Sequence, residues 1–325
     1  MIAFERRASA VLFNLLRSHE PEGPFLLPSN ICPIVPLTFF KAGRGFELID
    51  IAPDTLCMDP TRIRERLEAA HLPTPAGIIY VRTYGAIFDA EAVFGQIRKA
   101  LPHALIVDDR CLCEPDFGAE LAPDADVVLY STGYAKFVDI GFGGLGVFRE
   151  GVPYTRSVSD FDEADLASVT DQYKYALAAR APFQYVDGNW LDTAAPACSW
   201  REFRGQVERE RIRARETKRQ INSVYASRLP QAVQFPDDFQ SWRFNIHLRD
   251  KSAALRAISA AGLFASGHYD SLDGIFGFEE CQQSSLVHKH VINLFNDRYF
   301  SVRRAEDLVD VLSRLDLLQP SELFQ

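Results

Sequence analysis

Short apolar runs alternate with longer amphipathic segments over the first half of the chain. Apolar runs of about four to eight residues have the length of buried strands, and the segments between them repeat their apolar positions with the period of a helix. The predicted strands cover residues 24–27, 46–51, 77–82, 104–108, 126–131 and 144–148. The predicted helices cover residues 8–17, 60–70 and 90–100, and a proline-rich helix or turn covers 28–41. This alternation predicts an α/β fold in which a mostly parallel sheet lies between layers of helices.

The second half of the chain follows a different pattern. Residues 151–198 are irregular and interrupted by prolines, with one helical segment at 163–179. A long helix dense in Arg and Glu is predicted over 199–228. It is followed by predicted strands at 242–248 and 291–294 and by predicted helices at 251–261 and 305–317. We therefore predict a large domain over residues 1–200 and a smaller α+β domain over residues 201–325.

Composition and charge argue against several classes of protein. The chain has 325 residues, of which 47% are hydrophobic and 24% charged, as is ordinary for a globular protein. Its formal net charge of −9 argues against a nucleic-acid-binding protein and against attachment to an anionic membrane. No apolar run approaches the roughly 18–20 residues of a membrane span. No apolar stretch like that of a signal peptide follows the charged amino terminus, so we expect a cytoplasmic protein.

The cysteines do not form a recognisable metal site. The six cysteines, at positions 32, 57, 111, 113, 198 and 281, include no CxxC pair. Cys111 and Cys113 alternate along one strand end, as two metal ligands do, but no further cysteine or histidine pair has the spacing of a zinc site. We therefore expect no metal, and we interpret the cysteines as small buried residues in a reducing cytosol.

Two charged residues at the ends of predicted strands carry the candidate chemistry. Lys136 follows the strand that ends at Ser131, and Asp109 ends another apolar run, with Asp108 pointing to the opposite face of that strand. Parallel sheets bind ligands at the carboxyl ends of their strands, so we expect the amine and the carboxylate to meet. An amine that condenses with an aldehyde and an acid that keeps a ring nitrogen protonated are what pyridoxal 5'-phosphate (PLP) requires. We therefore predict Lys136 and Asp109 as catalytic residues of a PLP enzyme.

Candidate phosphate ligands lie at two places in the sequence. Ser131, five residues before Lys136, offers a hydroxyl. Ala8 and Ser9 open the first predicted helix, where free backbone N–H groups and the neighbouring Arg7 favour an anion. Each serine also has an ordinary structural explanation, one as a strand cap and the other as a residue of a first helical turn.

Taken in order, these residues resemble the fold type I PLP enzymes, in particular the DegT/StrS-like sugar aminotransferases, over nearly the whole chain. The similar segments are residues 25–33, 43–59, 81–85, 107–109, 131–144 and 218–225. The most specific is 131–144, which contains a lysine followed by a glycine cluster. The resemblance implies that Lys136 is the Schiff-base lysine and that Asp109 contacts the pyridine nitrogen.

Several positions depart from the pattern of the family. The aromatic residue that stacks on the cofactor ring falls near Cys32, which has no ring, and Leu112 stands where the family often has a Gln or His beside the phenolic oxygen. Phe142 replaces the glutamate of the GEGG segment, and Asn189 is only weakly similar to the segment by which a neighbouring subunit completes the site. The cofactor-binding residues that the resemblance implies are Ala8, Ser9, Cys32, Asp109, Ser131 and Lys136.

The resemblance implies a homodimeric aminotransferase. Such an enzyme takes an amino group from a small-molecule donor and passes it to a keto sugar or a related carbonyl acceptor. Two alternatives stay open: a PLP enzyme of other Cα chemistry, such as elimination, and a degenerate homologue that binds the cofactor without catalysis. A scaffold needs neither Lys136 nor Asp109, so the presence of both argues against the last.

Overall fold

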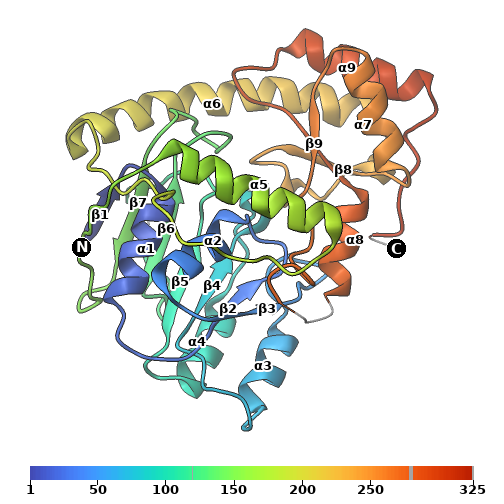
Figure 1. The fold of residues 1–325 in the computed structure, drawn as a ribbon. Coiled ribbons are helices and arrows are strands. Elements are labelled where there is room, and N and C mark those ends of the chain that lie inside the picture. The colour runs from blue at the N-terminus through green and yellow to red at the C-terminus, as the bar shows by residue number, and fades with distance from the viewer. Residues whose placement is uncertain (119, 278–280, 324–325) are drawn as a thin grey trace.

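The computed structural model describes residues 1–118, 120–277 and 281–323, and its centre is a seven-stranded sheet (Figure 1). In their order across the sheet the strands are β1 (Ile2–Glu5), β7 (Gly144–Phe148), β6 (Val127–Ser131), β5 (Leu105–Asp109), β4 (Gly77–Val81), β2 (Phe25–Pro28) and β3 (Phe46–Ile49). Strands β2 to β6 are parallel to one another, whereas β7 runs antiparallel to both of its neighbours. The predicted mostly parallel sheet is confirmed.

Helices cover both faces of this sheet. On one face lie α1 (Ala8–Ser18) and α2 (Ile34–Ala42), and on the other lie α3 (Pro60–Glu68) and α4 (Glu91–Ala100). The alternation of side chains along β4 explains this arrangement, because Ile79 belongs to the apolar core beneath α1 and Ile78 to the core beneath α4. The α/β sandwich inferred from the sequence is therefore correct.

A second, smaller sheet lies in the carboxyl-terminal part. It is antiparallel and contains β8 (Phe244–His247), β10 (Val291–Leu294) and β9 (Ala265–Gly267), in that order. Helices α7 (Lys251–Ala260) and α9 (Val302–Arg314) pack on it through apolar residues such as Ile258 and Leu308. Helix α8 (Gln282–His290) turns back toward the first sheet, where Val287 packs with Ile51 and Tyr84. Short 3-10 turns are η1 (Thr83–Gly85), η2 (Gln231–Val233) and η3 (Asp237–Phe239).

The long helix α6 (Trp200–Arg228) connects the two sheets, as Figure 1 shows. Phe203 and Val207 in its first half pack with Phe137 and Val138 beside the large sheet. Ile221 and Tyr225 in its second half belong to the core of the small sheet. Its start is fixed by a capping box in which Ser199 and Glu202 each satisfy a backbone N–H of the other. We keep the division near residue 200 as a proposal.

The strand β1 and the helix α8 are among the elements that were not predicted, and the structure supplies the reasons for these two. β1 is only four residues long, and it ends in Glu5, which is fully buried and bonded to Tyr154 and Arg156. α8 has no side-chain cap of its own; its first N–H groups donate to the carboxylate of Asp50, which lies in the large sheet's half of the chain. α5 (Glu163–Ala179) agrees with its predicted bounds and packs through Val169 on α1 and α2.

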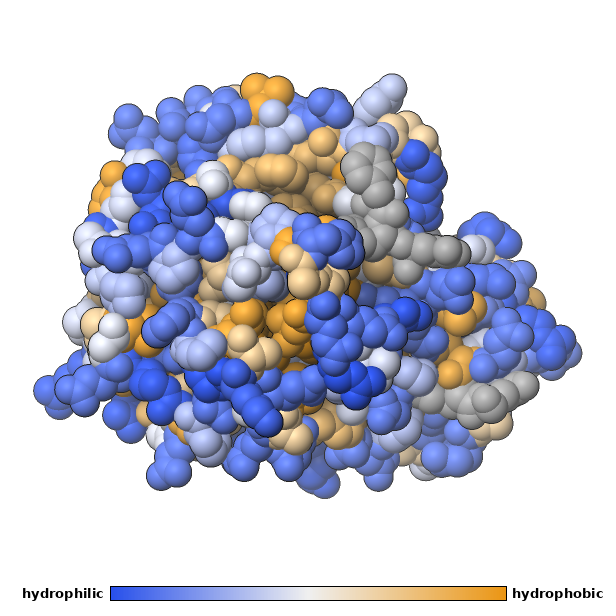
Figure 2. Space-filling model, turned by 90° about the horizontal axis from the view of Figure 1, so that it is seen from below, coloured by the Kyte–Doolittle hydropathy of each residue, from blue (hydrophilic) through white to orange (hydrophobic). Residues whose placement is uncertain are grey.

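The surface is mostly hydrophilic. Seen from below, its rim is polar and apolar residues gather toward the middle of the face (Figure 2). None of the helices in the part of the chain that the structure describes has both the length and the apolar character needed to cross a membrane. All six cysteines are free thiols, and Cys57, Cys113 and Cys281 are buried.

Candidate functional site

A cavity of about 460 Å³ opens where β2, β4, β5 and β6 end. Because these strands are parallel, their carboxyl ends meet at one edge of the sheet. The amino terminus of α1 and residues 268–269 complete the wall. All six residues predicted for the site line this cavity: Ala8, Ser9, Cys32, Asp109, Ser131 and Lys136. The structure therefore brings the predicted set together, while the role of each member stays a prediction.

Lys136 lies in a tight turn after β6 that is held by several hydrogen bonds. Ala135, the residue before it, has a left-handed backbone with φ of 59°, which an alanine adopts only when its surroundings impose it. The N–H of Ala135 donates to Asp139 Oδ2 at 2.9 Å, and its carbonyl accepts from the indole of Trp242 at 2.7 Å. The turn is closed by the bond from Ile140 N to Thr132 O at 3.0 Å. These contacts fix the backbone from which the half-buried Lys136 side chain extends.

Asp109 ends β5 and is buried in the cavity wall. Its Oδ1 accepts the backbone N–H of Cys111 at 2.8 Å. Burial raises the pKa of Asp109, and the bonds from Cys111 and the positive charge of Lys136 act in the opposite direction. The carboxylate of Asp109 and the amine of Lys136 line the same cavity and are close enough to interact electrostatically. A cation that bonds to this carboxylate would remove the cost of burying its charge.

Asp108 points to the opposite face of β5, as the strand alternation predicts. It is fully buried and accepts from Arg82 Nε at 2.7 Å and from Arg110 Nε at 2.9 Å. This carboxylate is neutralised by two guanidinium groups and has a structural role. Asp109 is the member of the pair that lines the cavity, and its role stays a prediction.

The amino terminus of α1 supplies hydrogen-bond donors to the cavity. Arg7 is the N-cap residue with extended backbone, so Ala8 and Ser9 present N–H groups that have no acceptor within the helix. Ser131 faces them from the end of β6, and its Oγ accepts the N–H of Gly133 at 3.4 Å. Arg7 Nη1 donates to Gly141 O at 3.0 Å, which places its charge beside this group. A helix terminus with hydroxyls and a guanidinium is suited to an anion.

The glycine cluster after Lys136 allows this helix end to approach the sheet. A Cβ added at Gly144 would lie 2.2 Å from the backbone nitrogen of Ala8. Gly143 has φ of 101°, and a Cβ there would lie 2.4 Å from Thr132 Oγ1. Both positions therefore exclude a side chain, and β7 passes directly beside the first residues of α1.

Cys32 forms part of the cavity wall in contact with Tyr269. The neighbouring Cys32 thiol and burial hold the pKa of the Tyr269 phenol well above its usual range. His268, the preceding residue, also lines the cavity. Burial lowers the pKa of His268 to about 3, so its imidazole is neutral at pH 7.

Sequence reasoning missed some residues of this wall. Cys111 lines the cavity because the Asp109 carboxylate bonds its N–H and turns the chain back across the strand end. Thr83 follows β4 and donates to Leu56 O at 2.6 Å. The position of Thr83 just after a parallel strand could have indicated that it belongs to the site. Tyr269 is a further residue of this wall, and nothing local in the sequence distinguishes it.

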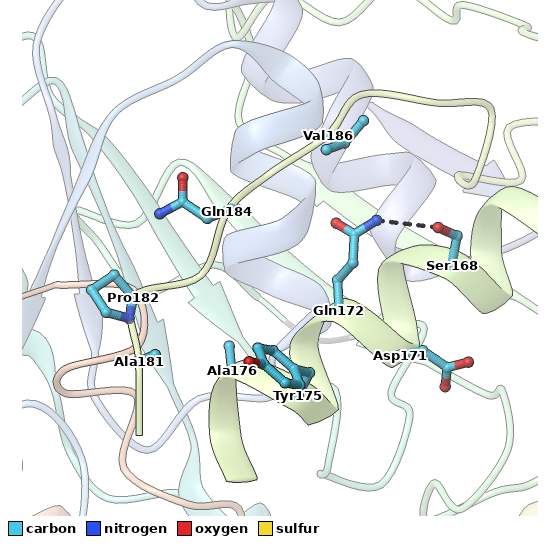
Figure 3. A pocket seen from close by; sticks show the side chains of 9 residues that line it. All are labelled: Ser168, Asp171, Gln172, Tyr175, Ala176, Ala181, Pro182, Gln184 and Val186. Atoms are coloured by element: carbon cyan, nitrogen blue, oxygen red, sulfur yellow. Dashed lines mark hydrogen bonds between the residues drawn. The ribbon is translucent and has the colours of Figure 1, made fainter. Parts of the chain in front are cut away.

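A second cavity of about 620 Å³ lies between α5 and the segment 181–186 (Figure 3). Gln172 and Ser168 are joined there by a hydrogen bond of 3.1 Å. Among the described residues of its lining there is no lysine and no arginine, and Asp171 is its charged member. This hollow therefore lacks the paired amine and acid, and the cavity around Lys136 is the candidate site.

Comparison with known proteins gives a likeness of structure rather than of sequence. No family model matches the chain, and no curated protein matches it. A putative sugar aminotransferase from Streptococcus pneumoniae, solved in its PMP form, has a TM-score of 0.69 and 15% identity over 97% of this chain and 87% of that one. A sugar aminotransferase from Micromonospora echinospora has a TM-score of 0.67 and 18% identity over 96% and 87%.

A third similar structure is a DegT DnrJ EryC1 StrS aminotransferase from Brucella abortus. Its TM-score is 0.66 and its identity 15%, over 97% of this chain and 85% of that chain. At such identities a likeness establishes the fold and leaves the chemistry to the site. The chain therefore has the fold of the PLP-dependent aminotransferases of the DegT/StrS type.

Proposed function

We propose that this protein is a PLP-dependent aminotransferase that acts on a keto sugar or a related carbonyl compound. The observation that carries the proposal is that Lys136 and Asp109 line one cavity, together with the donors at the amino terminus of α1. The similar structures are described as aminotransferases, and two of those reported above as sugar aminotransferases. These descriptions favour the same reaction for this chain.

The residues of the cavity fit a phosphorylated pyridine. Arg7, Ala8, Ser9 and Ser131 would bind the phosphate, because they combine free N–H groups, hydroxyls and a guanidinium. Asp109 would accept the protonated ring nitrogen and so recover the cost of its buried charge. The aldehyde end of the cofactor would then lie toward Lys136.

Bound PLP supplies an electron sink that stabilises negative charge at the substrate Cα. Lys136 would hold the cofactor through its Nζ and, once an amino donor replaces it, would take the Cα proton and return it at C4′. Asp109 would keep the ring nitrogen protonated throughout. The rigid turn that carries Lys136 would limit the positions that Nζ can reach.

The test is reductive trapping with a matched lysine. Protein incubated with PLP is reduced with borohydride and digested, and mass spectrometry locates the modified lysine. We expect modification at Lys136, its loss in K136A, and unchanged trapping in K174A, because Lys174 is exposed on α5. Bleaching of the visible absorption of the PLP-loaded protein by glutamate then tests for the transfer of an amino group. Absence of a trapped lysine would reject the proposal.

A second candidate keeps PLP and changes the reaction at Cα. Cys32 and Leu112 line the cavity at the positions where the family has a stacking ring and a partner for the phenolic oxygen. The presence of Cys32 and Leu112 at these positions would change the electronic properties of the bound ring, and these properties decide which reaction PLP catalyses. A protein that binds PLP at Lys136 but whose colour no amino donor changes would favour this candidate or the non-catalytic alternative.

We also propose that the protein acts as a homodimer in the cytoplasm. Exposed apolar side chains on and near α5, including Phe161, Leu166 and Tyr175, are suited to burial by a second chain. Six free thiols suit a reducing compartment. Sedimentation equilibrium of the loaded protein tests the dimer, and a monomer at all concentrations would contradict it.

A further inference from the structure

Cys32 and Tyr269 meet across the cavity although they are far apart in the sequence. Cys32 belongs to the segment after β2, and Tyr269 follows β9 of the small sheet. Both line the cavity, and the Cys32 thiol lies near enough to the phenol of Tyr269 to raise its pKa. The small sheet thus delivers an aromatic side chain to the place where the large sheet has only a thiol.

Tyr269 is a half-buried aromatic residue of this wall. Two other described aromatic side chains line the cavity. Tyr134 is 75% exposed and lies largely in solvent. His268 is 7% exposed and packs edge-on against Tyr84, with ring centroids 5.0 Å apart. Tyr269 is half-buried, and its ring lies tilted by 59° against the ring of His268, with the centroids 5.5 Å apart.

The segment that carries Tyr269 is held on its outer side. Asp270 accepts from Arg180 at 2.8 Å, and His288 Nε2 lies 3.5 Å from its other oxygen. His288 Nδ1 also contacts the backbone carbonyl of His268 at 3.1 Å. The backbone on both sides of Tyr269 is therefore fixed, and ligand binding needs little further ordering of this side chain.

We propose that Tyr269 packs against one face of the cofactor's pyridine ring and provides the aromatic contact that Cys32 cannot make. This inference rests on the proposed function, because the ring must be PLP held by Asp109. A protonated pyridine ring is electron-poor and is attracted to the electron-rich face of a phenol. Tyr269 is a positioning residue and takes no proton in the reaction.

The experiment compares three side chains at position 269. The dissociation constant of PLP is measured by absorbance titration, together with the circular dichroism of the bound cofactor, on the wild type, Y269F and Y269L. We expect Y269F to bind PLP as the wild type does, because it keeps the ring. We expect Y269L to bind about 2- to 10-fold more weakly, the size of an aromatic pair, and to lose intensity in the cofactor's dichroic band.

Each outcome decides the inference. Y269L with unchanged affinity and dichroism overturns it, and so does Y269F if it loses as much as Y269L, because the hydroxyl would then be the active group. Melting temperatures of the cofactor-free variants control for folding, and Y269M repeats the comparison with another flexible apolar side chain if Y269L is unstable. A wild type that is not trapped at Lys136 rejects the proposed function itself, whereas trapping with equal affinities rejects only the role of Tyr269.

Discussion

The indole N–H of Trp242 donates to the backbone carbonyl of Ala135 at 2.7 Å, one residue before Lys136. Trp242 precedes the first strand of the small sheet, so this bond ties that sheet to the turn that presents the lysine. Trp242 also stacks on Tyr84, with the two rings inclined by 8°. The position of Lys136 thus depends on both sheets.

We expect W242F to weaken PLP binding by about 2- to 10-fold, the value of one hydrogen bond of about 0.5–1.5 kcal/mol. The free Ala135 carbonyl lets the strained turn relax, so Nζ of Lys136 is less well placed. The matched control is W190F, since the buried Trp190 donates to Tyr185 at 3.0 Å and does not line the cavity. Both variants should lose similar stability in urea, and equal losses of PLP affinity would contradict the specific role of Trp242.

The variant D109N should raise the stability of the cofactor-free protein but weaken its binding of PLP. Burial raises the pKa of Asp109 in the folded state. The contribution of this carboxyl to stability is therefore full at a pH below its unfolded pKa, and it is lost as the pH rises through its folded pKa. At pH 7 the unfolded carboxyl is ionised, so its burial in the folded protein costs stability, and D109N removes that cost. We expect cofactor-free D109N to be more stable than the wild type in urea at pH 7, with the difference vanishing near the unfolded pKa of 3.8.

The same variant should bind PLP about 10- to 100-fold more weakly, because a charged hydrogen bond to the ring nitrogen is lost. The matched control is D108N, which removes a carboxylate bonded to Arg82 and Arg110 on the other face of β5. We expect D108N to destabilise the fold at pH 7. A D109N protein with wild-type affinity for PLP would exclude Asp109 from the site.

Lys218 should make stability depend on pH above neutrality. Burial and the neighbouring Arg243 lower its pKa to about 7, and its Nζ donates to Trp242 O at 2.6 Å and Asn296 Oδ1 at 2.9 Å. The unfolded chain binds the proton more tightly, so the free energy of unfolding rises with pH between about 7 and 10.5. The slope is at most about 1.4 kcal/mol per pH unit.

The measurement is urea denaturation of the wild type and K218M at several pH values in that range. K218M lacks the titrating amine, so we expect its stability to change less with pH than that of the wild type. K174M is the control, because Lys174 is exposed and pairs with Asp171 on its own helix. A wild type with no rise in stability above pH 7 would show that Lys218 is not held neutral.

G144A should damage the phosphate end of the site more than the rest of the fold. The new Cβ would lie 2.2 Å from Ala8 N and push α1 away from the sheet, at a cost of about 1–3 kcal/mol. We expect weaker binding of PLP but nearly unchanged binding of pyridoxal, which has no phosphate. G205A in α6, where the nearest atom is 3.5 Å away, should keep or raise stability by up to about 1 kcal/mol. Equal losses for both ligands would place the phosphate elsewhere.

Local pattern was sufficient for most of the first sheet and for the placement of Lys136 and Asp109 in one cavity. Strands β4, β5 and β6 are short, apolar and bounded by helices, so their parallel pairing follows from the alternation alone. Lys136 and Asp109 were predictable because the ends of parallel strands necessarily meet. The helix terminus at Ser9 was predictable because free N–H groups are a property of any helix start.

What the sequence did not reveal depends on contacts between distant segments. Lys218 belongs to a helix dense in Arg and Glu, a composition typical of a solvated helix, but it is 4% exposed and donates to Trp242 and Asn296. α8 was missed because its cap is Asp50, from the other sheet. Tyr269 reaches Cys32 only through the packing of the two sheets. The periodicity of apolar residues along the chain does not indicate which distant residues come into contact.

Helix α6 has a consequence for any attempt to separate the two halves of the protein. A cut at residue 200 exposes the apolar side chains of Phe203 and Val207 on the carboxyl-terminal fragment. It also exposes Phe137 and Val138 on the amino-terminal fragment, because α6 no longer packs against them. Each fragment then exposes an apolar patch that the other fragment covers in the intact protein. The two pieces should aggregate when made singly and recombine when made together in one cell.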